Sequence, residues 1–322
     1  MKIWNGKRKK EIFLRAAAGL LIAATALLGT ACGDSRNNEA RTETDDKGFY
    51  SYNGYVVKSD YPLDEDSVKK ATEKLNRIYE MYLDGKKVKT YYSLVPDKNF
   101  FIGNEAGMDT LDYEKLTEIM ASGAGEMEYI DITDLLDITD YYKTDAHWRQ
   151  ERIQDVANRL AEGMGIDLKA SYEEEIAAED FVGAYGRQSD LEMEPEPLNY
   201  MQNGMFASCK VTDYETNREI PIYDLSKAQS DKGEGYDLFL GGSKSLLTIE
   251  NPSCKTEREL VVFRDSFASS LVPFFVEGYS KITLIDIRYL PTEMVGRFVT
   301  FDRQDVLFLY STSVLNNSVT MK

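Results

Sequence analysis

Residues 260–287 read LVVFRDSFASSLVPFFVEGYSKITLIDI, and this stretch decides the predicted fold. It contains an apolar run at 260–263, a segment that we predict to be helical at 267–276, and a second apolar run at 282–287. Both runs are continuously apolar rather than alternating, which is typical of strands buried on both faces of a sheet. Alternation of such strands with helices predicts an α/β sandwich with a largely parallel sheet.

The same alternation continues outside this stretch, with a hairpin at 49–57 whose turn is the favoured pair Asn53-Gly54. We therefore predict a three-layer α/β/α sandwich with a mainly parallel sheet, spanning residues 49–322. The further predicted elements are helices at 63–83 (ended by Gly85), 112–121, 148–164 and 291–298, and strands at 88–95, 129–132 and 306–309.

Residues 170–250 do not follow this pattern. They are acidic, rich in Tyr and Gly, and lack a helical period after about residue 180. We interpret them as an insertion of loops and short β elements that packs over one edge of the sheet.

The N-terminus resembles an export signal. A basic segment at 1–15 precedes small and apolar residues at 16–31, and Cys32 follows directly. This order is typical of a lipoprotein signal at 1–31, in which Cys32 becomes the lipidated N-terminus and 32–48 form a flexible tether. The alternative is an uncleaved membrane anchor. Both interpretations place the domain in the cell envelope, outside the cytoplasmic membrane.

The composition excludes several classes of function. Lys and Arg number 38 against 55 Asp and Glu, so the net charge is −17, which argues against nucleic-acid binding. The chain has one His and no CxxC spacing, and it shows no P-loop or dinucleotide fingerprint, so we predict no metal and no cofactor. Cys209 and Cys254 are either a disulfide pair or two buried free thiols.

His147 is the single histidine and lies in KTDAHW (143–148), directly before the predicted helix at 148–164. An Asp two residues earlier, Asp145, can orient a histidine so that it acts as a general base. The alternative interpretation is a packed or surface histidine beside Trp148.

Ser266 follows the predicted strand at 260–263 and opens the next helix, in VVFRDSFA (261–268). At this position the backbone N–H groups of a helix N-terminus could stabilise an oxyanion, which suits a nucleophile. The alternative is that Asp265 or Ser266 caps the helix.

Together, an early Asp-x-His-Trp and a late Asp-Ser-Phe resemble the motifs of the DHHW family. This is a group of exported bacterial proteins, many of them lipoproteins, related to the SGNH-hydrolase-like proteins of alginate O-acetylation. Further similar segments are YYSLVPDKNFF (91–101), LIDIRY (284–289) and Gly241-Gly242 with Asn251 downstream. The sequence departs from the family pattern at Ala146, where the family has a first His, and at Arg264, where hydrolases have Gly.

The resemblance implies a triad of Ser266 as nucleophile, His147 as base and Asp145 as the residue that orients it. It also suggests Asn251 as a second oxyanion donor beside the Ser266 N–H, and Arg288 and Tyr289 as residues that contact substrate or anchor the insertion. The function it implies is a membrane-tethered serine esterase or O-acetyltransferase that acts on a cell-envelope or secreted glycan. Relatives depend on a membrane protein as acyl donor. The alternative is a non-catalytic glycan-binding or assembly lipoprotein that uses the same crevice.

Overall fold

The computed structural model of the chain describes residues 42–229 and 234–322. The predicted signal at 1–31, Cys32 and the tether up to residue 41 lie outside these ranges. Across the described residues, no helix has both the length and the apolarity needed to cross a bilayer.

The central sheet has eight strands, and five of them form a continuous parallel block. In spatial order this block is β5 (Glu128–Tyr129), β4 (Lys89–Val95), β13 (Asp305–Ser311), β11 (Glu259–Arg264) and β12 (Lys281–Ile285). Parallel strands end at the same edge of a sheet, so the residues after β4, β11, β12 and β13 come together there. The predicted fold class, an α/β sandwich with a mainly parallel sheet, is confirmed.

Beyond β12 the sheet continues antiparallel through three strands that the insertion supplies. These are β10 (Leu246–Glu250), β8 (Lys210–Asp213) and β9 (Arg218–Ile220). Residues 170–250 were predicted to be an insertion of loops and short β elements packed over one edge of the sheet, and three of their strands join that edge directly. Their strands extend the sheet because the edge of β12 offers unpaired N–H and C=O groups to a neighbour.

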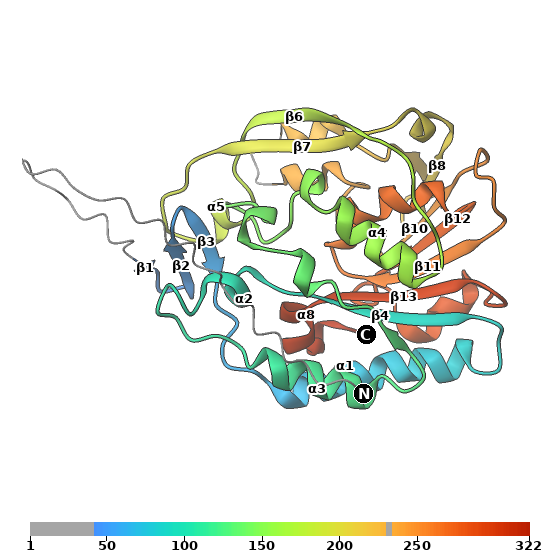
Figure 1. Cartoon of the computed structure of the whole chain (residues 1–322), viewed down its shortest axis with the longest axis horizontal. Helices are drawn as coiled ribbons and strands as arrows, with labels where there is room; N and C mark the ends of the chain where they lie inside the picture. The colour runs from blue at the N-terminus through green and yellow to red at the C-terminus, as the bar shows by residue number, and fades with distance from the viewer. Residues whose placement is uncertain (1–41, 230–233) are drawn as a thin grey trace, which may run out of the picture. The chain divides into compact units, whose positions relative to one another are not determined.

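Helices cover both faces of the sheet (Figure 1). The face with Val261 and Phe263 packs against α1 and α3, whereas the face with Leu260 and Val262 packs against α4 and α7. Alternate residues of one strand thus enter two different cores, which explains why the strand is apolar at every position. The α-helices are α1 (Glu65–Ile78), α2 (Lys98–Ile102), α3 (Tyr113–Gly123), α4 (Gln154–Gly163), α5 (Tyr185–Gln188), α6 (Leu225–Ala228), α7 (Ala268–Leu271) and α8 (Thr312–Asn316).

Several helices cover fewer residues than their apolar pattern predicts. The helix expected at 148–164 starts as α4 only at Gln154, because Trp148 pairs with Tyr141 in a β-bridge. The helix expected at 267–276 is α7 followed by a 3₁₀ segment that contains Pro273, which has no N–H to continue an α-helix. A π-helical turn, Tyr79–Leu83, extends α1, and 3₁₀ turns occupy Thr133–Leu135, Ile138–Asp140, Gln150–Arg152, Gly204–Ser208, Gly235–Leu238, Val272–Glu277, Thr292–Arg297 and Ser318–Thr320.

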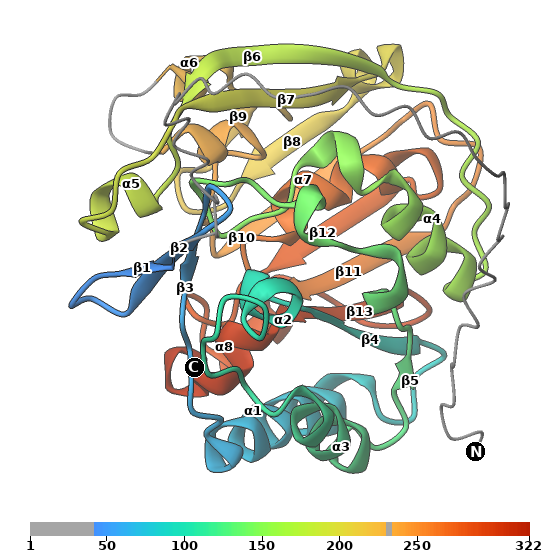
Figure 2. The same ribbon diagram turned by 60° about the vertical axis from the view of Figure 1, so that its left-hand side comes forward.

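Two small sheets lie outside the central one (Figure 2). The first is the expected hairpin, β2 (Phe49–Tyr52) and β3 (Tyr55–Lys58), with β1 (Glu43–Thr44) added at its edge. Asn53 and Gly54 both have positive φ, as the predicted turn requires. The second is the pair β6 (Glu173–Phe181) and β7 (Glu196–Gln202), which belongs to the insertion. Cys209 and Cys254 are free thiols.

Residues 42–48 belong to the folded part of the chain, because Asp45 links the first hairpin to the insertion. Its carboxylate accepts hydrogen bonds from the N–H groups of Phe49 (2.8 Å) and Asp190 (3.0 Å) and from the Ser189 hydroxyl (2.9 Å). Desolvation acts to raise the pKa of Asp45, but these donors outweigh it and lower the pKa to about 2.

A depressed carboxyl pKa stabilises the fold above the ordinary value and loses this contribution as the pH falls towards the folded-state value. We therefore expect the Phe49 and Asp190 amides to lose protection from hydrogen exchange between about pH 4 and about pH 2, as the pKa of Asp45 dictates. In Asp45→Asn the same amides should exchange faster already at neutral pH. Equal protection of these amides in the variant and the parent at neutral pH would contradict this role.

Candidate active site

Ser266 lies at the edge where the parallel strands end, two residues after β11. The carboxylate of Asp265 fixes this turn, since it accepts hydrogen bonds from Phe267 N–H (3.0 Å) and from Ser311 N–H at the end of β13 (2.7 Å). Phe267 is the N-cap residue of α7 and no side chain caps that helix, so neither Asp265 nor Ser266 serves as the cap. The Ser266 hydroxyl is therefore not needed for helix capping.

His147 lies in a short loop closed by the β-bridge between Tyr141 and Trp148. The indole N–H of Trp148, which is fully buried, donates to the Phe267 carbonyl (3.1 Å) and to Ser270 Oγ (2.9 Å). Trp148 thereby attaches the histidine loop to the segment that follows Ser266. The two motifs are 119 residues apart in the sequence, and this packing brings them together.

An unbroken chain of hydrogen bonds joins the three residues of the predicted triad. His147 Nδ1 lies 2.6 Å from Asp145 Oδ1, and His147 Nε2 lies 2.7 Å from Ser266 Oγ. When Nδ1 carries the proton it donates to the carboxylate, and Nε2 is free to accept the hydroxyl proton. The arrangement can move a proton from Ser266 to the ring while Asp145 holds the ring in place.

Asp145 is buried, yet both oxygens of its carboxylate accept hydrogen bonds from protein donors. Oδ1 accepts from the His147 N–H (3.1 Å), and Oδ2 accepts from the Ala184 N–H of the insertion (2.7 Å). Burial acts to raise the pKa of Asp145, but the adjacent His147 ring and these donors lower it below the ordinary value. The group that faces the ring is therefore a carboxylate at neutral pH.

Because Gly183 has no side chain, the Asp145 side chain can pack directly against its backbone. A Cβ at this position would lie 2.4 Å from Asp145 Cβ and 2.4 Å from Oδ2, closer than atoms can approach. We expect Gly183→Ala to displace the carboxylate and to lower turnover at this site about 10²-fold, the cost of a misplacement of about 1 Å. Esterase kinetics test this, with Gly204→Ala as a matched control, because a Cβ there meets nothing within 4 Å. Equal activity of the two variants would show that Asp145 tolerates the shift.

Tyr236 is a site residue that sequence reasoning missed. Its ring stacks on the His147 ring with centroids 3.9 Å apart and planes 7° apart, and its hydroxyl pairs with Ser270 Oγ at 2.7 Å. Phe267 contacts the same imidazole, with centroids 4.9 Å apart. These two rings fix the plane of the imidazole. No local pattern marks Tyr236, because it comes from the insertion and approaches His147 only in the folded chain.

Lys98 and Glu196 hold the histidine loop in place through hydrogen bonds to its backbone. The ammonium of Lys98, 2% exposed, donates to the carbonyls of Val56, Tyr142 (3.0 Å) and Lys143 (3.2 Å). Burial lowers the pKa of Lys98 to about 7, and nearby Asp145 and Glu196 oppose that shift. Glu196 in turn accepts from the Thr144 N–H at 2.8 Å. Lys98 belongs to the YYSLVPDKNFF segment, whereas nothing in the sequence singles out Glu196.

A cavity of about 260 Å³ opens beside Ser266 and His147. It is bordered by β3, the N-terminus of α2, α5 and the N-terminus of α8, and its lining includes Lys98, Tyr185 and Ser311. The Ser266 N–H has no hydrogen-bond acceptor among the described residues. A small ester could thus enter beside the hydroxyl, with this N–H available as a donor.

Asn251 does not lie at this site, so its prediction as an oxyanion donor is wrong. It follows Glu250, which pairs with Lys281 at the beginning of β12, and its amide donates to the Val276 carbonyl (2.9 Å). Ser266 lies beyond the end of β11, at the opposite edge of the sheet. Because β10 runs antiparallel to β12, its end and that of β11 point in opposite directions.

Arg288 and Tyr289 lie at the correct edge, after β12, but neither lines the cavity beside Ser266. The Arg288 side chain pairs with Asp286 at 2.7 Å, and its guanidinium lies 5.6 Å from the centre of the exposed Tyr289 ring. Asp286 N–H, rather than Arg288, bonds to Ser245 of the insertion at 2.9 Å.

Arg264 is fully buried and holds the Gly-Gly segment against the serine turn. Its guanidinium donates to the carbonyls of Gly242 (3.3 Å), Lys244 (3.3 Å) and Asp265 (3.3 Å) and to Ser269 Oγ (3.0 Å). The residue that replaces the hydrolase Gly therefore contributes structure around Ser266 and does not project into the cavity.

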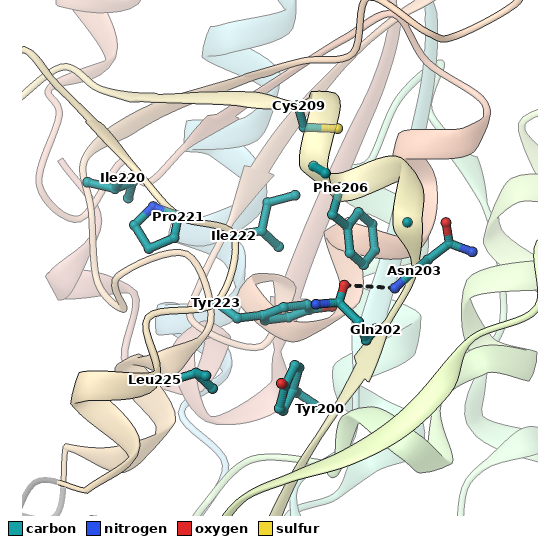
Figure 3. A pocket seen from close by; sticks show the side chains of 12 residues that line it. Tyr200, Gln202, Asn203, Phe206, Cys209, Ile220, Pro221, Ile222, Tyr223 and Leu225 are labelled. Atoms are coloured by element: carbon teal, nitrogen blue, oxygen red, sulfur yellow. Dashed lines mark hydrogen bonds between the residues drawn. The ribbon is translucent and has the colours of Figure 1, made fainter.

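Elsewhere the insertion lines a second, open cavity of about 350 Å³ (Figure 3). Aromatic rings of Tyr200, Phe206 and Tyr223 surround it, and no residue of the predicted triad lines it. In the described ranges, no group of three or more His, Cys, Asp or Glu side chains is arranged to hold a metal ion.

No family model and no curated protein matches the sequence. Solved structures do match. A DHHW family protein from Eubacterium siraeum superposes with a TM-score of 0.69 at 20% identity, over 87% of this chain and 96% of that chain. Bacillus cereus PatB1 superposes with a TM-score of 0.62 at 18% identity, over 86% of this chain and 97% of that chain. For the O-acetyltransferase domain of Pseudomonas putida AlgJ the TM-score is 0.51 at 10% identity, over 86% of this chain and 92% of that chain.

At these identities the comparison establishes the fold, and it covers nearly all of each matched chain. The structural match thus confirms, at the level of the fold, the resemblance drawn from the sequence: the chain shares the fold of the DHHW family protein, PatB1 and the O-acetyltransferase domain of AlgJ.

Proposed function

We propose that this protein is an exported, membrane-tethered serine esterase or O-acetyltransferase that transfers acetyl groups to or from a glycan of the cell envelope. The observation that carries the proposal is the chain of hydrogen bonds from Asp145 through His147 to Ser266, 2.6 and 2.7 Å long. The structural likeness to an O-acetyltransferase domain supports acetyl as the transferred group. The basic and apolar residues before Cys32 support export and lipidation.

In the first step Ser266 Oγ attacks the acetyl carbonyl while His147 Nε2 takes the hydroxyl proton. Collapse of the tetrahedral intermediate breaks the bond to the donor oxygen, and His147 returns the proton to that oxygen. Acetyl-Ser266 and the free donor alcohol result. Asp145 stabilises the imidazolium while it exists, because its carboxylate stays on Nδ1–H.

In the second step a sugar hydroxyl or water attacks the acetyl-enzyme, and His147 takes its proton. The bond between the acetyl carbon and Ser266 Oγ then breaks, and His147 gives its proton to Oγ. The products are the acetylated sugar, or acetic acid that ionises to acetate, together with regenerated Ser266. The unpaired N–H of Ser266 supplies one oxyanion donor in both steps, at a residue that is partly exposed and lines the cavity.

Covalent labelling of the serine tests this proposal. A solved relative carries a sulfonyl adduct, so we choose a sulfonyl fluoride as probe, beside a fluorophosphonate. Labelling of a protein that comprises residues 42–322 is expected at Ser266, located by peptide mass spectrometry, and is expected to disappear in Ser266→Ala and His147→Ala. Ser122→Ala, an exposed helix position, is the control.

A folded protein that reacts with neither probe and hydrolyses no acetyl ester would exclude the esterase and transferase proposal. Membrane attachment has its own test. Incorporation of labelled palmitate by the full chain should be lost in Cys32→Ser, and equal incorporation would rule out lipidation at Cys32.

A further inference from the structure

The cavity beside Ser266 carries an excess of negative charge. Its lining contains three carboxylates, Asp60, Asp97 and Asp265, against two ammonium groups, Lys58 and Lys98. The carboxylate of Asp145 lies directly behind His147. The whole chain has a net charge of −17, so the long-range field has the same sign as the cavity.

Two of the three cavity carboxylates already have a hydrogen-bond donor on each of their two oxygens. Asp97 accepts from Tyr113 Oη (2.8 Å), Thr312 Oγ1 (2.7 Å) and two backbone N–H groups. Asp265 holds Phe267 N–H and Ser311 N–H, one on each oxygen. Neither group has an oxygen without a partner.

Asp60 is different, because only its Oδ2 has a partner, the hydroxyl of Ser313. Among residues 42–229 and 234–322, no donor contacts its Oδ1. The side chain follows β3 and lines the same cavity as Ser266 and His147. Nearby Lys58 directs its ammonium to the Lys47 carbonyl and the Phe49 ring, 4.6 Å from the ring centre, rather than to Asp60.

We propose that Asp60 Oδ1 binds a hydroxyl or amide N–H of the acceptor sugar, and that the site therefore selects an uncharged glycan over a polyuronate. This inference rests on the proposed function and adds the class of the acceptor to it. A carboxylate with an open acceptor position favours ligand groups that donate hydrogen bonds. A sugar carboxylate in the same place brings a like charge against Asp60 in a partly buried cavity.

The burial of Asp60, like its open Oδ1, favours a ligand group that donates a hydrogen bond. Burial raises the pKa of Asp60 above its ordinary value, and the Ser313 hydroxyl and Lys58 only partly oppose that shift. A desolvated carboxylate of this kind gains from a sugar hydroxyl that replaces the lost water.

Binding of tetrasaccharides to the Ser266→Ala protein tests the inference without any need for turnover. Calorimetry would compare two uncharged ligands, cellotetraose and tetra-N-acetylchitotetraose, with tetramannuronate at low and high salt. We expect one or both uncharged ligands to bind and tetramannuronate to bind at least about tenfold more weakly at low salt. Adding Asp60→Asn to this protein should weaken binding of the uncharged ligand about tenfold. It should also reduce the ratio between the affinities for the uncharged ligand and for tetramannuronate. Asp84→Asn, an exposed carboxylate away from the cavity, is the matched control.

Turnover supplies the second readout. With p-nitrophenyl acetate as donor, Asp60→Asn should lower the ratio of transfer to the bound tetrasaccharide over hydrolysis about tenfold. Thermal unfolding checks that the variant is folded. Tighter binding of tetramannuronate than of either uncharged ligand, binding of none of the uncharged ligands, or an unchanged ratio in Asp60→Asn would overturn the assignment. Absence of ester hydrolysis in the parent would instead count against the proposed function, and the binding experiment would still decide the role of Asp60.

Discussion

Replacing Ser266 by alanine is expected to lower acetyl-ester turnover on the order of 10⁵-fold. The loss is this large because no other described hydroxyl contacts His147 Nε2. Without Oγ no acetyl-enzyme forms, and only binding and the oxyanion donor remain. Hydrolysis of p-nitrophenyl acetate measures the effect, with Ser122→Ala as control and circular dichroism as the check of folding.

The double variant Ser266→Ala/His147→Ala gives the sharper test. Residues that act as one unit are strongly non-additive, so it should be no less active than the slower of the single variants. A further loss that multiplies the two single effects would mean that Ser266 and His147 act separately. Turnover of Ser266→Ala within tenfold of the parent would exclude Ser266 as the nucleophile.

The second large effect is expected for Asp145→Asn, which should lower turnover about 10⁴-fold while the fold is retained. Three N–H groups donate to this carboxylate, from the His147 ring, the His147 backbone and Ala184. An amide offers only one oxygen, so in either orientation its NH₂ group faces a donor. When NH₂ faces the ring, it forces the proton to Nε2, and the ring can no longer accept from Ser266.

The pKa of Asp145 lies below its ordinary value, so the parent keeps the carboxylate ionised throughout the neutral range. A pH–rate profile should therefore show a deficit of Asp145→Asn at every pH of the neutral range, where protonation of the parent's carboxylate does not contribute. Asp84→Asn is the control for a charge change at the surface. A deficit below tenfold would show that Tyr236, Phe267 and the loop orient His147 without Asp145.

The local sequence predicted the residues that carry the proposed chemistry, but not all of their surroundings. Short-range rules placed Ser266 after a continuous apolar run and the Asp145–His147 pair before an amphipathic one, and left their roles open. The resemblance to the DHHW family then implied the triad. Asn251 was misplaced for a physical reason. The resemblance suggested Asn251 without showing in which direction the preceding strand runs, and β10 is antiparallel to β12, so Asn251 lies at the edge opposite Ser266.

The contribution of the insertion was the largest omission. Its residues Gly183, Ala184, Glu196 and Tyr236 all contact the histidine loop or its ring. Each is an ordinary residue in an acidic, irregular segment, and no period or motif distinguishes it. Asp60 was missed in the same way, because a carboxylate with an open oxygen is recognised only after the partners of its neighbours are known.

By itself, the sequence determined the fold class, the two motifs and the identity of the single histidine. These features depend on interactions between residues that are close in the chain, namely the burial pattern of strands and helices and the chemistry of individual side chains. Only the tertiary structure decided that His147 Nε2 meets Ser266 Oγ at 2.7 Å across 119 residues. That contact depends on long-range packing of Trp148 against Phe267 and Ser270, whose geometry no local pattern encodes.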